Sequence, residues 1–339
     1  MKLAIIAHPR FPIKSPYAGG LEAFTGALVE YYQSVYEVTL YAHPDSEVDC
    51  KLKSFPMDNS QYQQYPDIVE NDFMLKVMDD ITKEQFDVVH NNSLNPIPIL
   101  WASKNNIPML TTLHTPPYSK LKAVVGLASY SPFIHFTAVL HSLAEAWEPF
   151  INDKVEVTYN GIDLKRWQVT KKPQDYVFTY GRILPSKGID IAISTAQQMG
   201  IAIKFAGPIA DQHYMDDVVR PLLKPCDTYL GHLDHHSIKH QLAHAKAAVF
   251  GTRWDEPFGL STLEAMATGT PVVSFNRGAF AEIVSEGAGV LAKGNNVNSL
   301  AAALEASFSL NRSDVIKSAR NFPIAKMCSE YSNILGRIA

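Results

Sequence analysis

The sequence predicts an α/β protein built from two doubly wound halves. Short runs rich in β-branched and aromatic residues alternate with amphipathic helical stretches, which is the pattern of βαβ units and parallel sheets. The alternation breaks in the charged, proline-containing segment 169–173 and then begins again. A length of 339 residues favours two domains of ordinary size.

This break predicts four segments. We expect an N-terminal Rossmann-like domain at 1–168, a linker at 169–175, a second Rossmann-like domain at 176–318, and a helical segment at 319–339 that packs back on the first domain. Open α/β sheets bind ligands beyond the carboxyl ends of their strands. Polar motifs that directly follow strands are therefore the candidates for a functional site.

In the first half, the sequence indicates six strands and one long helix. The helix is expected at 21–33, where apolar residues recur on one side. Segment 45–66 has weak periodicity and many polar residues, so we expect irregular structure there. The strands are expected at 3–7, 38–41, 86–90, 108–112, 136–139 and 155–157.

The second half repeats the alternation. Helices are predicted at 189–199 and 236–245, and the apolar spacing of Ile324–Ile338 indicates an amphipathic terminal helix. That helix is expected to dock on a core. Peripheral membrane contact is the alternative, which we disfavour because only Lys326 and Arg337 could form a basic face. Strands are expected at 176–180, 201–205, 229–230, 247–250 and 272–275.

Composition excludes several classes of partner. A net charge of −4 argues against a nucleic-acid partner bound through bulk positive charge. Three cysteines without a Cys-x-x-Cys pair indicate a reducing compartment. The apolar run near the start is too short for a signal peptide, and no run approaches a transmembrane helix. We therefore expect a soluble cytoplasmic protein.

The stretch 255–273, DEPFGLSTLEAMATGTPVV, is chemically the most informative. It predicts a loop, a short helix capped by Ser261 with Glu264 as its capping-box partner, and a strand after the C′ residue Gly269. Glu256 and Glu264 flank the helix N-terminus, whose free N–H groups and dipole favour an anion. Two carboxylates around such a seat suit the hydroxyls that flank the diphosphate of a nucleotide sugar. The alternative is that Glu264 only closes the capping box and Glu256 is a surface acid.

The loop after the expected strand 176–180 reads Gly181-Arg182-Ile183-Leu184-Pro185-Ser186-Lys187-Gly188. Its glycines allow close backbone approach, and Arg182 and Lys187 supply fixed positive charge, as a phosphate loop requires. It is not a Walker A loop. By themselves, these two cations could also be solvated surface residues.

Taken together, these motifs resemble those of the retaining GT-B glycosyltransferases of family 4. The filled Glu-x7-Glu string matches the family signature, and the Gly-Arg-x4-Lys-Gly loop matches its diphosphate element. Gly19-Gly20 before the first helix, His114 after a strand, and the turn 160–163 occupy the matching places. The resemblance implies the GT-B fold, in which two Rossmann-like domains face each other across a cleft, the first on the acceptor side and the second binding the nucleotide sugar.

The resemblance also implies roles for individual residues. It places Arg182 and Lys187 on the diphosphate, Glu256 on the donor-sugar hydroxyls, and Glu264 on the ribose. The implied catalytic residues are His114, Arg182, Lys187 and Glu256. The implied donor-binding residues are Gly19, Gly20, Arg182, Lys187, Glu256, Phe258, Gly259, Leu260 and Glu264.

The implied reaction transfers a sugar, with retention, from a nucleotide diphosphate sugar, most simply a UDP-sugar, to a hydroxyl of a glycan, lipid or small molecule. No Asp-x-Asp motif is present, so we expect no metal and no other cofactor. The histidines 232, 235, 236, 240 and 244 lack the spacing of a zinc site and are interpreted as a polar helix face. The alternatives are a GT-B-like epimerase or phosphorylase and a non-enzymatic two-domain sugar-binding protein.

Overall fold

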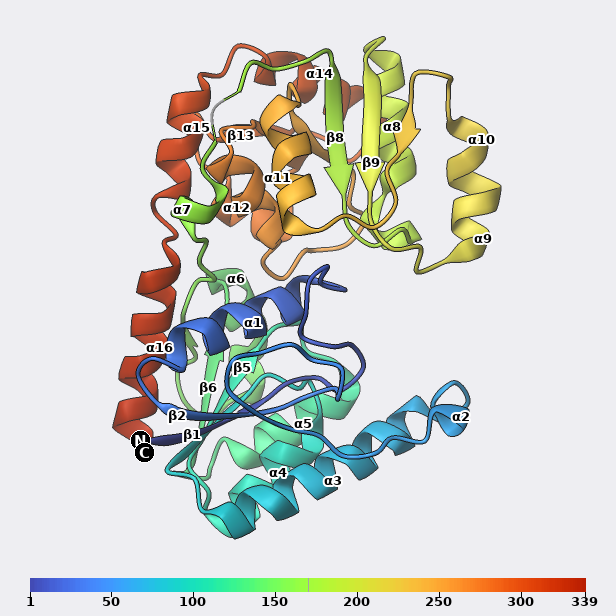
Figure 1. The fold of residues 1–339 in the computed structure, drawn as a ribbon. Helices are drawn as coiled ribbons and strands as arrows, with labels where there is room; N and C mark the ends of the chain where they lie inside the picture. Colours follow the sequence, from blue (N-terminus) through green and yellow to red (C-terminus); the bar gives the residue numbers. More distant parts are fainter. Residues whose placement is uncertain (170) are drawn as a thin grey trace. The chain divides into compact units, whose positions relative to one another are not determined.

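The computed structural model describes residues 1–169 and 171–339, without the side chain of residue 59. Thr170 of the predicted linker lies outside the described residues. The chain divides into two compact units: unit 1 comprises Met1–Tyr159 with Lys326–Ala339, and unit 2 comprises Asn160–Ala325 (Figure 1). The domain boundaries derived from the sequence, at 168 and 176, stay a prediction.

Unit 1 is built on a seven-stranded parallel sheet in the order β3-β2-β1-β4-β5-β6-β7. The order reverses between β1 and β4, which makes the sheet doubly wound and places a switch point at the carboxyl ends of these two strands. Its strands are β1 (Lys2–Ile6), β2 (Glu37–Tyr41), β3 (Lys51–Lys53), β4 (Val88–Asn91), β5 (Met109–Leu113), β6 (Ile134–Ala138) and β7 (Glu156–Val157).

The helices of unit 1 connect these parallel strands. Most of the terminal helix α16 also belongs to unit 1, where the ring of its Tyr331 lies 5.9 Å from that of Phe24. The helices are α1 (Gly20–Tyr32), α2 (Asn59–Tyr62), α3 (Pro66–Glu84), α4 (Pro96–Asn105), α5 (Ser119–Ala128), α6 (His141–Trp147), the 3-10 helix η1 (Glu148–Phe150) and α16 (Ile324–Ile338).

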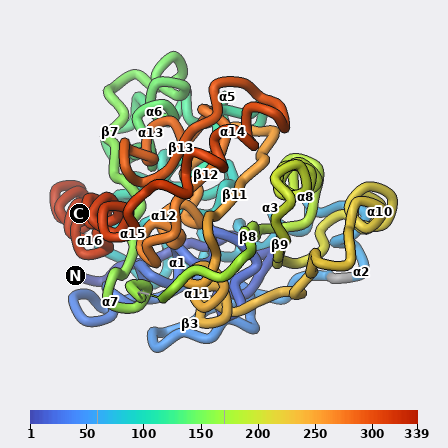
Figure 2. The backbone as a smooth tube through the Cα atoms, turned by 90° about the horizontal axis from the view of Figure 1, so that it is seen from above, coloured from blue at the N-terminus to red at the C-terminus, as the bar shows by residue number. Residues whose placement is uncertain are grey.

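Unit 2 has a six-stranded parallel sheet in the order β10-β9-β8-β11-β12-β13. Strands β11, β12 and β13 follow one another in the tube view (Figure 2). The strands are β8 (Tyr176–Tyr180), β9 (Ala202–Ala206), β10 (Thr228–Tyr229), β11 (Ala248–Phe250), β12 (Val272–Phe275) and β13 (Gly289–Ala292).

The helices of unit 2 lie on both faces of its sheet. Residues alternate along each strand, so Val177 and Val249 face α8 and α14, whereas Phe178 and Phe250 point to the opposite face. The helices are α7 (Leu164–Trp167), η2 (Pro185–Lys187), α8 (Ile189–Gln198), α9 (Gln212–Tyr214), η3 (Met215–Val219), α10 (Arg220–Leu222), α11 (His235–His244), α12 (Leu260–Ala267), α13 (Gly278–Ile283), α14 (Val297–Ser307) and α15 (Arg312–Ala319).

The predicted α/β class with two doubly wound sheets is confirmed. The central strands are buried on both faces and consist of continuous apolar runs, which is why the sequence located them within about two residues. The segment expected to be irregular is mostly so, but it also holds β3 and α2, which the sequence did not predict. Lys51–Lys53 carries no apolar run, and its strand forms by pairing with β2. In the part of the chain that the structure describes, no helix has the length and apolarity needed to cross a membrane.

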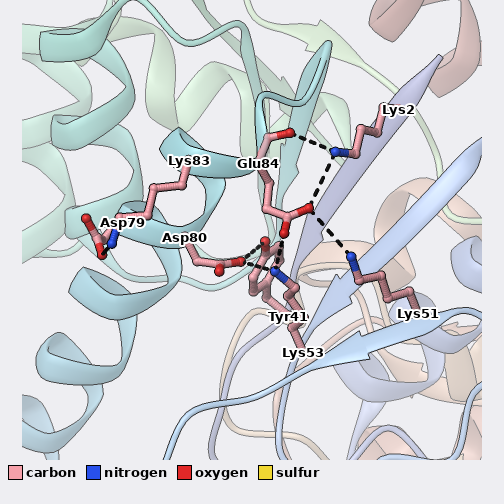
Figure 3. A network of polar contacts seen from close by, with 8 residues as sticks. All are labelled: Lys2, Tyr41, Lys51, Lys53, Asp79, Asp80, Lys83 and Glu84. Carbon is pink, nitrogen blue, oxygen red and sulfur yellow. Dashed lines mark hydrogen bonds and ion pairs between the residues drawn. The ribbon is translucent and has the colours of Figure 1, made fainter.

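A polar network ties the end of α3 to the edge of the sheet in unit 1 (Figure 3). Glu84 accepts from Lys53 at 3.0 Å and forms ion pairs with Lys51 and Lys2 at 3.5 and 3.4 Å. Lys53 also binds Asp80 at 2.6 Å. The bond and charge of Lys53, followed by the charges of Lys51 and Lys2, lower the pKa of Glu84 to about 2. The network holds the helix on β1 and β3.

The first prediction concerns this network. A carboxyl whose pKa is lower in the folded than in the unfolded protein stabilises the fold above the unfolded value and stops doing so as the pH falls toward the folded one. Replacing Glu84 by Gln should therefore lower the melting temperature at pH 6 to 7, and the difference from the parent protein should narrow as the pH falls from 5 to 3. Thermal unfolding as a function of pH measures this.

Asp79→Asn is the matched control, because Asp79 pairs with exposed Lys83 one turn along the same helix and lies outside the network of Glu84 (Figure 3). Isolated exposed pairs contribute little to stability, so this variant should melt like the parent. If both variants melted alike at every pH, the network at Glu84 would make no special contribution.

Candidate functional site

Two loops of unit 2 cross at the carboxyl edge of its sheet. Gly188, between β8 and α8, has a left-handed φ of +62°, and a Cβ there would lie 1.9 Å from the carbonyl oxygen of Gly251, which follows β11. A Cβ on Gly251 would likewise lie 2.6 Å from the Gly188 oxygen. Only glycine at both places allows this approach. The crossing joins the loop that carries Arg182 and Lys187 to the loop that carries Glu256.

An ion pair fastens the same crossing. The Arg253 guanidinium donates to both carboxylate oxygens of Asp190, at 2.8 and 2.5 Å, and to the Pro185 carbonyl at 2.8 Å. The Tyr214 hydroxyl donates to Asp190 at 2.5 Å. Burial opposes ionisation of Asp190, but the bonds from Arg253 and Tyr214 outweigh it and lower the pKa of the carboxyl. Sequence reasoning missed this pair, because neither Asp190 at the start of α8 nor Arg253 in the loop after β11 belongs to a recognisable motif.

Glu256 is held by two donors on one carboxylate oxygen. Lys187 Nζ forms an ion pair with Glu256 Oε1, and Trp254 Nε1 donates to the same atom at 2.9 Å. Lys187 also lies 5.0 Å from the centre of the Trp254 ring. The backbone carbonyl of Glu256 accepts from the N–H of Ala279 at 2.9 Å, which ties the loop to helix α13.

Arg182 and Lys187 differ more than their shared motif indicates. The alternative that both are solvated surface cations does not hold for Lys187, whose side chain is 21% exposed and paired with Glu256. Its position in the turn η2, before the left-handed Gly188, aims it at the neighbouring loop. Arg182 is exposed and forms no hydrogen bond or ion pair with any residue that the structure describes. It is available to a ligand anion.

Helix α12 begins two residues earlier than predicted, and its cap differs. Gly259, with φ +69°, is the N-cap, and no side chain caps the helix. The predicted capping box is wrong, because Ser261 is the second helical residue and Glu264 the fifth. The left-handed turn at Gly259 lets the chain enter the helix without a polar cap. The confirmed C′ residue is Gly269, with φ +73° after Thr268.

Glu264 is buried in unit 2, with 7% of its surface exposed. Its Oε2 accepts from the Tyr180 hydroxyl, and its Oε1 lies 3.8 Å from His235 Nε2. Burial raises the pKa of Glu264, and the charge of His235 and the bond from Tyr180 partly offset this. With the capping box removed, no local helical function accounts for this buried acid.

The other residues of the motif surround this helix start. Phe258 is 3% exposed, and its ring centre lies 6.5 Å from that of Phe322. Leu260, the first residue of α12, is half-buried. The N–H of Thr262 donates to the Gly259 carbonyl at 2.8 Å, but no side chain caps the helix, so the N–H groups of Leu260 and Ser261 remain available to an anion.

In unit 1, the predicted residues follow β1 and β5. Gly19 is the extended N-cap of α1, and Gly20 is its first residue. His114 Nε2 lies 2.8 Å from Asn92 Oδ1, and its ring packs edge-on against Phe24 at 4.7 Å. A carbonyl oxygen only accepts, so Nε2 carries the proton and Nδ1 is left as an acceptor. Burial lowers the pKa of His114 to about 3, which keeps the ring neutral.

Two histidines of α11 contact each other. His244 Nδ1 donates to the His240 carbonyl at 2.9 Å, and the two rings lie 4.4 Å apart. Among the described residues, no group of three histidines, cysteines or acids could hold a metal ion.

Two family models match adjacent parts of the chain. Glycosyltransferase Family 4 matches residues 18–166, and Glycosyl transferases group 1 matches residues 162–322. The two matches together span nearly all of both units.

Similar proteins carry glycosyltransferase names. Glycogen synthase of Mycobacterium tuberculosis (strain ATCC 25618 / H37Rv) is 34% identical over 163 residues, 44% of this chain, and the chain spans only 39% of that relative's length. Putative glycosyltransferase YtcC of Bacillus subtilis (strain 168) is 24% identical over 329 residues, which cover 84% of this chain and 77% of the length of that relative. The solved structure of Anabaena Alr3699/HepE in complex with UDP-glucose has a TM-score of 0.81 at 18% identity, covering 99% of this chain and 100% of that chain. The glycosyltransferase WaaG has a TM-score of 0.77 at 12% identity, with 98% and 99% covered. These structures share the GT-B fold with the chain.

The second prediction tests the loop crossing. Gly188→Ala should destabilise the protein by more than about 3 kcal/mol, because the methyl group adds a backbone overlap to the cost of a left-handed alanine. Gly200→Ala is the matched control: Gly200 has nearly the same φ, +65°, at the other end of α8, and a Cβ there meets nothing within 4 Å. It should cost only about 1 kcal/mol. Urea unfolding gives both values, and equal losses would show that the crossing tolerates a methyl group.

Proposed function

The chain belongs to the group 1 glycosyltransferases of family 4, and we propose that it is a retaining enzyme that transfers a sugar from a UDP-sugar to an acceptor hydroxyl. The observation that carries the proposal is the arrangement in unit 2: Glu256 and buried Glu264 on either side of an uncapped helix start, with Lys187 on Glu256. UDP-glucose in the similar Anabaena structure supports the uridine donor. The acceptor hydroxyl belongs to a glycan, a lipid or a small molecule.

The leaving diphosphate needs positive charge as its bond to the sugar breaks. We assign this task to Arg182, which has no partner among the described residues, to Lys187, and to the N–H groups at the start of α12 near Gly259 and Leu260. Because Lys187 is already fixed on Glu256, it can bind a phosphate oxygen while the carboxylate faces the sugar beside it. These groups replace a metal ion, and we propose that the enzyme needs no cofactor.

The remaining groups bind the rest of the donor. Glu256 would accept from hydroxyls of the transferred sugar, and Glu264 from the ribose. Neutral His114 would accept a sugar hydroxyl at Nδ1, and Gly19-Gly20 would let backbone approach the phosphates. Buried Phe258 would shape the turn rather than touch the ligand.

Retention follows from attack on the face from which the diphosphate leaves. The acceptor oxygen bonds to the anomeric carbon as the bond from that carbon to the phosphate oxygen breaks. The acceptor's proton passes to that phosphate oxygen, so no base from the protein is required. In this proposal unit 2 is the nucleotide-sugar domain and unit 1 the acceptor domain. Free cysteines at 50, 226 and 328 support a cytoplasmic location.

A GT-B-like epimerase or phosphorylase and a sugar-binding protein are the competing functions. Incubation with UDP-sugars, with and without acceptor or inorganic phosphate, separates them by their products. An epimerase changes the donor without acceptor, a phosphorylase requires phosphate, and a binding protein gives no product. Thermal shift with a panel of nucleotide sugars first identifies the donor, since a ligand of the folded state raises its melting temperature.

The third prediction separates the two glutamates. Glu264→Gln should weaken UDP binding about 10-fold, because a charged acceptor of the ribose hydroxyls is lost. Glu256→Gln should keep UDP affinity within about 2-fold while turnover falls at least about 100-fold, because its partner is the transferred sugar. Calorimetric titration with UDP and a turnover assay in EDTA measure both. Full turnover of Glu256→Gln would remove it from the donor sugar, and loss of turnover in EDTA would contradict the metal-free proposal.

The fourth prediction concerns the two cations. Arg182→Ala and Lys187→Ala should each weaken UDP binding about 10- to 100-fold, the amount expected for one charge-assisted hydrogen bond. Only Lys187→Ala should also lower the melting temperature, since Arg182 forms no hydrogen bond or ion pair within the part of the chain that the structure describes. Lys76→Ala, which breaks an exposed pair with Asp72 in unit 1, is the control and should bind UDP normally. Unchanged UDP affinity in both site variants would refute the diphosphate assignment.

A further inference from the structure

We propose that Tyr180 is a positioning residue that holds the Glu264 carboxylate in the orientation that binds the ribose of the nucleotide. The inference rests on the proposed function, because it refines how that site recognises its donor. Tyr180 is the last residue of β8 and directly precedes the phosphate loop. Neither the sequence motifs nor the family matches singled it out.

The geometry fixes which carboxylate oxygen is free. The Tyr180 hydroxyl has one proton and two acceptors in reach: Glu264 Oε2, which is nearer, and the Ser261 carbonyl at 3.1 Å. The proton therefore goes chiefly to the carboxylate. With Oε2 engaged, Oε1 is the oxygen left to accept from a ribose hydroxyl. A carboxylate without this bond could rotate, and its binding geometry would not be defined.

The tyrosine is itself held rigidly. Its ring stacks on Phe178, with centres 5.3 Å apart, and meets Phe250 at 6.0 Å. Both neighbours are buried residues of the central strands. The hydroxyl therefore reaches Glu264 from a fixed point of the sheet, which lowers the ordering cost that a ligand would otherwise meet.

Few other groups act on Glu264. From α11, His235 Nε2 lies 3.8 Å from Oε1, and its ring packs on Trp167 of α7 at 5.2 Å. From α15, Arg312 directs its Nη1 and Nη2 donors to the carbonyls of Ala243 and Ala245 and to the 268–270 turn, not to Glu264. Of the charged and titratable groups named here, Tyr180 is the one that donates a hydrogen bond directly to the Glu264 carboxylate.

The same bond aligns two parts of the donor site. The Tyr180 hydroxyl contacts Glu264 and the Ser261 carbonyl, both of α12. Tyr180 also directly precedes Gly181-Arg182 in the chain. The ribose contact and the diphosphate contact are thereby held at a fixed spacing. A nucleoside diphosphate presents its ribose and phosphates at a fixed covalent spacing too, so the bond favours this ligand over free phosphate.

The experiment compares Tyr180→Phe with Tyr176→Phe. Tyr176 lies on the same strand and face, and its hydroxyl donates to the Gln241 carbonyl at 2.8 Å, away from Glu264. Tyr180→Phe should weaken UDP binding about 5- to 10-fold, the loss expected for one hydrogen bond to a charged group, and leave inorganic diphosphate binding unchanged. Tyr176→Phe should bind both ligands like the parent.

The pH profile gives a readout that a packing role would not change. Tyr180 bonds to the ionised carboxylate, so its removal favours the protonated form of Glu264. Because burial already raises the pKa of Glu264, the pH below which UDP affinity is lost should move upward in Tyr180→Phe. It should not move in Tyr176→Phe. Melting temperatures confirm that both variants are folded.

A double-mutant cycle with Glu264→Ala completes the test. If Tyr180 acts through Glu264, Tyr180→Phe should have no further effect on UDP affinity in the Glu264→Ala background. An equal loss of UDP and diphosphate affinity, additive losses in the cycle, or an unmoved pH profile would each overturn the inference. Should Glu264→Ala not fold, the diphosphate comparison and the pH profile still decide. Failure of Tyr180→Phe alone leaves the proposed function standing, whereas normal UDP binding by Glu264→Gln refutes the ribose role of Glu264 and this inference with it.

Discussion

Gly188 and Gly251 approach so closely that a methyl group on either would overlap the carbonyl of the other. This contact sets the distance between the loops after β8 and β11, and the Arg253–Asp190 pair locks it from the side. Every predicted residue of unit 2 lies on these loops or on the helices they lead into. The positions of Lys187 and Glu256 thus depend on a backbone contact that contains no functional group.

Both candidate acids of unit 2 have partners among the described residues. Glu256 faces Lys187 and Trp254, and Glu264 faces Tyr180 and His235. An unpaired buried carboxylate would cost several kcal/mol or take up a proton. Exposed Arg182 is the exception among the predicted cations. The two candidate acids are therefore paired within the protein, whereas Arg182 forms no hydrogen bond or ion pair with any residue that the structure describes.

The sequence predicted most of the sheet, because fully buried parallel strands are continuous apolar runs that periodicity identifies. It failed at β3, whose Lys51–Lys53 segment is a strand only because β2 lies beside it. It also failed at Ser261: a polar residue before an apolar helix predicts a cap, but left-handed Gly259 starts the helix instead. Backbone conformations at glycine depend on tertiary contacts, which a single sequence does not contain.

In the candidate site, too, the motifs identify the candidate residues, whereas their hydrogen-bond partners are known only from the fold. The motifs supplied Glu256, Glu264 and His114, because carboxylates and histidines at the ends of strands suggest chemistry. Their supporting partners are Trp254, two residues before Glu256 on the same loop, and Tyr180 and Asn92, which lie at the ends of neighbouring strands; none of the three belongs to a recognised motif. Each partner binds one atom of its functional residue and so leaves a defined atom free. Orientation of this kind must exist before the ligand arrives if binding energy is to be used on the transition state. The partner residues, which the sequence does not reveal, therefore orient the site residues that the motifs predict.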